Sequence, residues 1–164
     1  MAKKEKEDEE IIVDEIPLKD CFIITPIGAS NSETFKKADG LIRSVLRPIL
    51  SKYGFNALPA YEIDATGSIT KQIIQHIVND ELVIANITGL NPNVMYELAI
   101  RHSFKKKVIT LAEAGTKLPF DITDQRTIFY EDSLIGSEIA KPLLEKAIID
   151  VLKNEVTSNK TVAR

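Results

Sequence analysis

Five short apolar runs that alternate with helical patterns are the feature that most constrains the fold of this chain. The runs lie at 21–24, 56–60, 82–87, 108–111 and 127–130, and the segments between them mostly repeat apolar residues at three- and four-residue spacing. Strands that alternate with helices pair in parallel and connect through right-handed crossovers. The pattern therefore predicts an α/β fold in three layers around a parallel sheet.

Five strands with helices on both faces favour a flavodoxin-like arrangement, a five-stranded parallel sheet of order 2-1-3-4-5. The first long helix is expected over 33–53, with a kink at Pro48, and a closing helix over 137–153. Pro59 favours an edge position for the second strand, because proline has no backbone N–H to donate to a neighbouring strand.

Size and charge limit the domain organisation and the partners. The chain has 164 residues, 44% of them hydrophobic, which predicts one folded domain at 16–156 between a charged flexible tail at 1–15 and a flexible C-terminus at 157–164. The net charge of −3 indicates that the protein does not bind nucleic acid. No apolar run approaches membrane-spanning length, and the charged tail lacks the apolar core of a signal peptide, so we expect a cytoplasmic protein without a membrane partner.

The sequence shows no pattern typical of a metal or cofactor site. Cysteine and histidine do not cluster at zinc-like spacing, and the acidic residues form no EF-hand loop. The single Cys21 opens an apolar strand and has no basic neighbour to activate it, which disfavours a nucleophilic role. We therefore expect neither a metal nor a cofactor.

In the predicted sheet, the loops after the first and third strands border one crevice, at the switch point where open α/β sheets bind ligands. These loops span 26–32 and 88–93. Gly28 permits a close backbone approach, the hydroxyls of Ser30 and Ser32 are suited to a phosphate or sugar, and Asp64 is placed to reach the rim. The candidate substrate-binding residues are Pro26, Gly28, Ser30, Ser32, Asp64, Asn86 and Thr88.

A helix is expected to begin directly after the third strand. Asn91 is suited to cap it and Pro92 fits its first position. Glu97 then lies about a turn and a half into the helix and shares a face with Asn93. A carboxylate at the end of a central strand suggests chemistry on a small polar molecule. The alternative is an ordinary surface pair between Glu97 and Arg101, four residues further on.

Several segments resemble the nucleoside 2-deoxyribosyltransferase-like group, which is related in fold to bacterial TIR-like NAD-cleaving domains. The resemblance covers about 20–131. It is specific at 91–98, which reads Asn-Pro-Asn-Val-Met-Tyr-Glu-Leu, and weak when 21–28 is taken alone. The other segments that carry it are 81–89, 119–121 and 126–130. The chain departs from the group at Asn86, where relatives often carry aspartate, and at Ala99, where they tend to carry glycine.

The resemblance implies cleavage of an N-glycosidic bond with Glu97 as the nucleophile, while Asn91 and Asn93 orient the sugar and the carboxylate. Water would complete hydrolysis, and a second base would complete a transfer. Tyr96 is expected to pack in the core rather than to touch the ligand. The resemblance also implies a homo-oligomer, since related enzymes complete their sites across subunit contacts.

Three functions stay open at this point. The first is an enzyme acting on a nucleoside, a nucleotide or NAD, and the second is a non-catalytic nucleotide-binding sensor or signalling module that uses the same crevice. The third is a structural or interaction domain. The sequence does not choose the base, the sugar, or hydrolysis over transfer.

Overall fold

The predicted sheet is confirmed in the computed structural model, which describes residues 16–64, 66–123 and 126–161. Five strands lie in the order β2-β1-β3-β4-β5, and all neighbouring pairs are parallel. Their bounds are β1 Lys19–Ile24, β2 Phe55–Pro59, β3 Leu82–Asn86, β4 Ile109–Glu113 and β5 Thr127–Tyr130. The strand with Pro59 lies at one edge, as the proline predicts.

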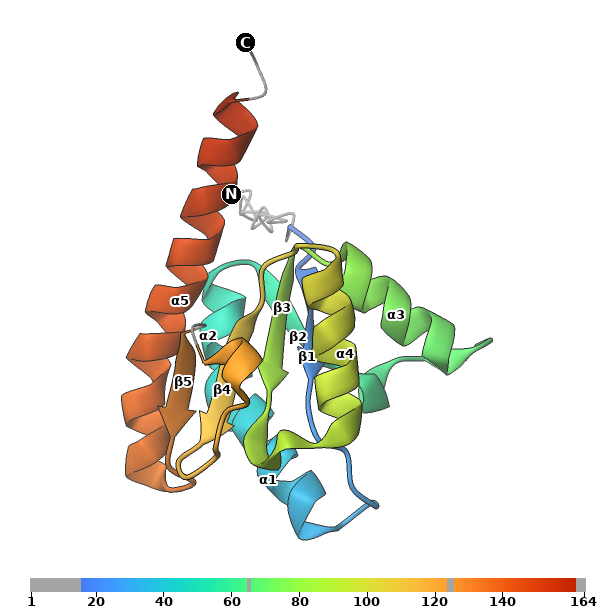
Figure 1. Ribbon diagram of the computed structural model, residues 1–164, viewed down its shortest axis with the longest axis vertical. Helices are drawn as coiled ribbons and strands as arrows, with labels where there is room; N and C mark the ends of the chain where they lie inside the picture. Colours follow the sequence, from blue (N-terminus) through green and yellow to red (C-terminus); the bar gives the residue numbers. More distant parts are fainter. Residues whose placement is uncertain (1–15, 65, 124–125, 162–164) are drawn as a thin grey trace, which may run out of the picture.

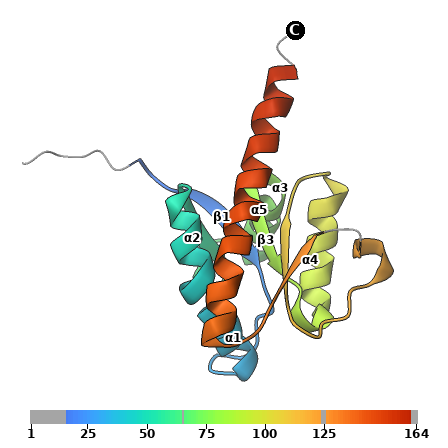
Figure 2. The same ribbon diagram turned by 90° about the vertical axis from the view of Figure 1, so that its left-hand side faces the viewer.

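Helices cover both faces of the sheet and complete the three layers. They are α1 Glu33–Leu41, α2 Arg47–Lys52, α3 Ile69–Asn79, α4 Pro92–Ser103 and α5 Leu134–Thr161. Figure 2 shows α1, α2 and α5 on one side of the sheet and α4 on the other. In Figure 1, α5 runs beside β5 and continues past the end of the sheet.

The core consists of two clusters separated by the sheet. Cys21, Leu82 and Ile84 pack toward α1, α2 and α5, whereas Phe22 and Val83 pack toward α3 and α4. All residues of β3 are buried, because a central parallel strand is covered on both faces. This explains why its sequence is a continuous apolar run instead of an alternating one. The Cys21 thiol is fully buried, and burial raises its pKa, which argues against a nucleophilic role.

The helical pattern of 33–53 is interrupted before Pro48 rather than at it. Residues Ile42–Leu46 form a π-helical turn, in which Arg47 N donates to Ile42 O. Proline at position 48 has no N–H for the carbonyl of Ser44, and its ring crowds that carbonyl. The wider turn accommodates both effects, and the chain continues as α2 without a break.

The ends of the chain are described only in part. α5 continues to Thr161, so the expected flexible segment at 157–164 begins within this helix, while 162–164 and the tail at 1–15 lie outside the described residues. Of the helices described, none combines the length and apolar character needed to cross a bilayer. Within the described ranges, no three acidic, histidine or cysteine side chains gather as metal ligands would.

Candidate functional site

The start of α4 places Glu97 at the carboxyl end of β3. Asn91 caps this helix, because its side-chain oxygen accepts from the backbone N–H of Asn93 at 3.0 Å and of Val94 at 3.3 Å. Pro92 occupies the first turn, as its fixed φ allows. Gly89 adopts φ 65° in the short turn before the cap, a conformation that glycine tolerates without strain. Glu97 therefore lies in the second turn of a firmly capped helix.

Glu97 lines a small pocket between α3, α4 and the residues that follow β1. The pocket has a volume of about 270 Å³ and is lined by Thr25, Ile27, Thr70, Ile73, Ile74, Asn91, Asn93, Val94, Tyr96 and Glu97. Most of these neighbours are apolar or amide side chains. Burial among them raises the pKa of Glu97 from 4.5 to about 7. We call this space the Glu97 pocket.

A carboxyl group with a pKa near 7 is about half ionised at neutral pH. Its charged form is a poorly solvated carboxylate, which is suited to attack an electrophilic carbon or to stabilise a developing cation. Its protonated form can donate a hydrogen bond instead. Both forms are available to this side chain near pH 7.

The prediction that Tyr96 packs in the core is wrong. The side chain is 69% exposed and lines the Glu97 pocket. Tyr96 directly precedes Glu97 in α4, and neighbouring residues of a helix point about 100° apart. Val94 and Leu98 occupy the face of α4 that packs on the sheet, and this leaves Tyr96 at the surface.

A larger polar cavity lies beside the Glu97 pocket, on the side of α1. Its volume is about 530 Å³, and its lining is Pro26, Glu33, Thr34, Lys37, Ala38, Asn86, Thr88, Gly89, Asn91, Pro92, Glu113 and Tyr130. Asn91 lines both spaces. Successive residues after β1 also divide between them, since Thr25 and Ile27 line the Glu97 pocket and Pro26 lines the polar cavity.

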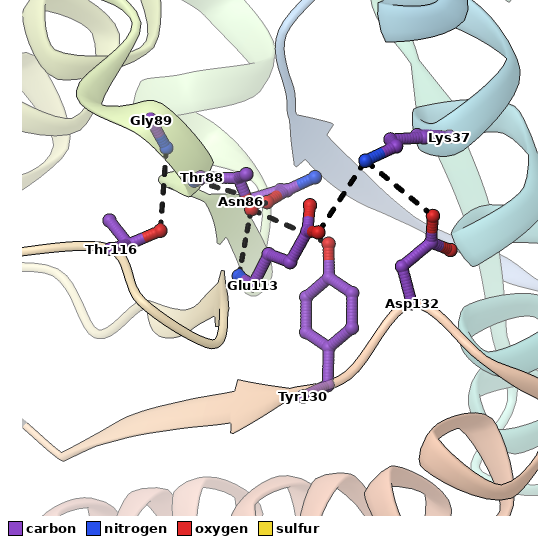
Figure 3. A network of polar contacts seen from close by, with 8 residues as sticks. All are labelled: Lys37, Asn86, Thr88, Gly89, Glu113, Thr116, Tyr130 and Asp132. Carbon is purple, nitrogen blue, oxygen red and sulfur yellow. Dashed lines mark hydrogen bonds and ion pairs between the residues drawn. The ribbon is translucent and has the colours of Figure 1, made fainter.

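Thr88 organises the floor of the polar cavity (Figure 3). Its hydroxyl donates to Asn86 Oδ1 at 2.6 Å and accepts from the backbone N–H of Glu113 at 2.9 Å. The Tyr130 hydroxyl lies 3.4 Å from the hydroxyl oxygen of Thr88. Asn86 is buried, and its Nδ2 donates to Thr25 Oγ1 at 3.4 Å. One threonine thus connects the ends of β3, β4 and β5.

Lys37 of α1 reaches across the cavity to two carboxylates (Figure 3). Its Nζ lies 3.4 Å from Glu113 Oε1 and 3.7 Å from Asp132 Oδ2. The charge of Glu113, then its hydrogen bond and the charge of Asp132, raise the pKa of Lys37, so the ammonium stays protonated. Burial raises the pKa of the Tyr130 hydroxyl, which stays neutral.

The structure brings together six of the ten residues that the sequence proposes for the site. Asn91, Asn93 and Glu97 line the Glu97 pocket, and Pro26, Asn86 and Thr88 line the polar cavity beside it. In the described structure, four others line neither space: Gly28, Ser30, Ser32 and Asp64.

Local structure explains the positions of these four residues. The Ser32 hydroxyl caps α1 by accepting from the backbone N–H of Phe35 at 3.1 Å, and this bond stabilises the start of the helix. Gly28 is needed for close approach to this cap, since a Cβ there would collide with Ser32 Oγ. Ser30 and Asp64 are exposed in the loops after β1 and β2.

The polar cavity contains residues that were not anticipated from the sequence, among them Lys37, Glu113 and Tyr130. Glu113 and Tyr130 are the last residues of β4 and β5, and they are direct neighbours in the strand register. A polar residue that ends a predicted parallel strand is a detectable signal, since ligands bind at that edge of the sheet. Lys37 carries no comparable signal, because it reads as a solvated helix residue.

Comparisons with known proteins find similarity to solved structures. Neither a family model nor a curated protein matches the chain. Among solved structures, the 2-deoxyribosyltransferase from the psychrotolerant bacterium Bacillus psychrosaccharolyticus is similar at a TM-score of 0.48 and 19% sequence identity, over 68% of this chain and 85% of that one. At this level, the likeness bears on neither the substrate nor the site.

Proposed function

We propose that the protein cleaves or transfers at the N-glycosidic bond of a nucleoside, a nucleotide or NAD, with Glu97 as the nucleophile. One observation carries the proposal: a half-buried carboxylate with a pKa raised to about 7 lines a pocket at the β1/β3 switch point. The resemblance of 91–98 to the nucleoside 2-deoxyribosyltransferase-like group supports it.

The proposed reaction has two steps. A Glu97 carboxylate oxygen bonds to the anomeric carbon while the carbon–nitrogen bond breaks, and the electron pair leaves with the base. Positive charge develops on the sugar in this step, and the poorly solvated carboxylate stabilises it. A water molecule then attacks the anomeric carbon and breaks its bond to Glu97, which leaves as a carboxylate. The proton that this water loses balances the proton that the departing base takes up. A second base in place of water gives transfer.

Asn91 and Asn93 have different roles in this proposal. The Asn91 oxygen is occupied in capping α4, so it positions the backbone of the helix that carries Glu97. Asn93 is exposed, lies one turn before Glu97 and lines the same pocket. Its side-chain amide is therefore available to orient a sugar hydroxyl beside the carboxylate.

Incubation with nucleosides, nucleoside monophosphates and NAD tests the proposal, with release of the free base followed by chromatography. We expect at least one of these classes to lose its base in the presence of the intact chain. Absence of base release from all three classes would contradict the proposal.

The pH dependence of the reaction provides a separate prediction. Only ionised Glu97 is nucleophilic, and its pKa lies near 7, so kcat/KM should rise about tenfold from pH 6 to pH 8. The initial rate at low substrate concentration, measured across this range, reports this titration in the free enzyme. A profile already flat above pH 5 would indicate a carboxylate with an ordinary pKa, contrary to the burial of Glu97.

A nucleotide-binding sensor is the second candidate, and one observation favours it. The protonated form of Glu97, which is abundant at neutral pH, can donate a hydrogen bond to a ribose oxygen without chemistry. In that case a nucleotide should raise the melting temperature without releasing a base. The incubation above separates the two functions directly.

A further inference from the structure

The Glu97 pocket alone is small for the proposed substrates. Ligand sites typically enclose about 300 to 1,000 Å³. The Glu97 pocket, at about 270 Å³, falls just below this range, and the polar cavity, at about 530 Å³, lies within it. The two spaces share Asn91 and meet at the residues that follow β1. A ligand that reaches Glu97 therefore has adjoining room on the α1 side.

We propose that the polar cavity receives the leaving base of the substrate, a neutral heterocycle with an amino or amide group, while the pentose occupies the Glu97 pocket. The inference rests on the proposed function. A nucleophile attacks the anomeric carbon from the side opposite the leaving group. With Glu97 in one space, the base belongs on the far side of the carbon, and the polar cavity lies on the other side of Asn91.

The charges of the polar cavity favour a neutral hydrogen-bond donor over a phosphate. Glu33 and Glu113 both line the cavity, and Lys37 is the positively charged side chain among the described residues that line it. Lys37 lies close to Glu113 and also to Asp132, at 3.4 and 3.7 Å, so its charge is already balanced. A phosphate would meet excess negative charge there, whereas an amino or amide N–H would meet carboxylate acceptors.

The walls and floor of the cavity suit a flat ring. Pro26, Pro92 and the ring of Tyr130 supply apolar surface at its boundary. The bonds of Thr88 to Asn86 and to the Glu113 backbone hold the floor in place before a ligand arrives. Glu113 itself is partly exposed, at 29% of its side chain, so its carboxylate remains within reach of a ligand.

Binding of free bases to the variant Glu97→Gln, which the proposed function predicts to be inactive, tests the inference without turnover. Adenine, cytosine and nicotinamide are titrated at millimolar concentrations, with NMR shifts of the backbone amides as the readout. At least one base should shift the amides of Thr88, Gly89 and Glu113, and adding Glu113→Gln should weaken its binding about tenfold, because a charged acceptor becomes a neutral one. Inorganic phosphate should shift none of them.

Glu138→Gln in the same background is the matched control. Glu138 also pairs with a lysine, Lys141 at 2.7 Å, but it lies on α5 outside the cavity. Base binding should be unchanged in this variant. The inference is overturned if no base shifts the cavity amides, if Glu113→Gln binds as well as its parent, or if phosphate competes with the base.

Failure of this inference and failure of the proposed function give different results. Turnover by the unsubstituted chain, with no base in the polar cavity, would leave the proposed function standing and overturn the inference alone. Turnover that survives Glu97→Gln would overturn the proposed function, whatever binds in the polar cavity.

Discussion

Replacing Glu97 with glutamine should lower kcat/KM for base release by at least about a thousandfold, because removal of a covalent nucleophile typically costs this much or more. Glutamine keeps the size and shape of the side chain but cannot form the glycosyl ester. The measurement is base release under substrate conditions that give turnover by the unsubstituted chain. Glu138→Gln, on the exposed surface of α5, is the control and should keep full activity.

The same substitution should also stabilise the fold above neutral pH. The folded pKa of Glu97 is about 7 and its ordinary value is 4.5, so the folded state binds more protons between these values. The free energy of unfolding then falls as pH rises from 4.5 to 7, by up to about 3 kcal/mol and less where solvent screens the carboxylate. A neutral glutamine avoids this loss.

Together, the two measurements separate a catalytic role from a structural one. Lost activity with equal or higher stability at about pH 8 is the result expected of a nucleophile held in an unfavourable environment. Lost activity with lower stability would indicate that Glu97 supports the fold, and unchanged activity would exclude it as the nucleophile.

Replacing Arg101 with methionine should lower the free energy of unfolding by about 3 to 5 kcal/mol, since several carbonyls lose their donor and an unsatisfied buried acceptor costs about 1 to 3 kcal/mol. Arg101 is 1% exposed, and its guanidinium donates to the carbonyls of Ile77, Asp80 and Lys107 at 2.9, 2.8 and 3.0 Å. Methionine fills much of the volume but leaves these buried carbonyls without their donor. Denaturant unfolding measures the difference.

Arg43→Met is the matched control for this prediction. Arg43 pairs with Asp39 at 2.7 Å, but its side chain is 63% exposed, and exposed pairs contribute about 0 to 1 kcal/mol. An Arg101 variant that loses no more stability than the Arg43 variant would contradict the structural role. The contrast separates the burial of the arginine from the mere removal of a positive charge.

Arg101 bears directly on the alternative that Glu97 forms a surface pair with it. The guanidinium is directed to backbone carbonyls next to the start of β3, at the end of the sheet opposite Glu97. It therefore ties α4 to the chain that enters the central strand. In the sequence, an arginine four residues after a glutamate looks like an ordinary helix-surface pair, and only the packing of α4 reveals its burial.

The fold followed from the sequence because the pattern of apolar residues is local. β3 is buried on both faces, which gives an unbroken apolar run, and β2 carries a proline that suits an edge. The start of α4 was equally local, since Asn91 and Pro92 specify a cap and a first turn. The approximate position of Glu97 at the end of a central strand followed from these signals.

The polar cavity could not be predicted in the same way. Lys37 and Glu113 are 76 positions apart, and their contact depends on how α1 packs across the ends of β3 and β4. Glu113 and Tyr130 become neighbours through the register of β4 with β5. Ser32, by contrast, was proposed as a ligand-binding residue, and its hydroxyl caps α1, because the start of a helix leaves backbone N–H groups that need an acceptor.

The sequence by itself determined the alternation of strands and helices and the helix that carries Glu97, because periodicity and helix caps act between residues a few positions apart. Only the tertiary structure decided the raised pKa of Glu97, the burial of Arg101 and the polar cavity around Lys37. Each of these depends on which distant side chains exclude water or supply charge at one point, and that is set by packing rather than by neighbouring residues.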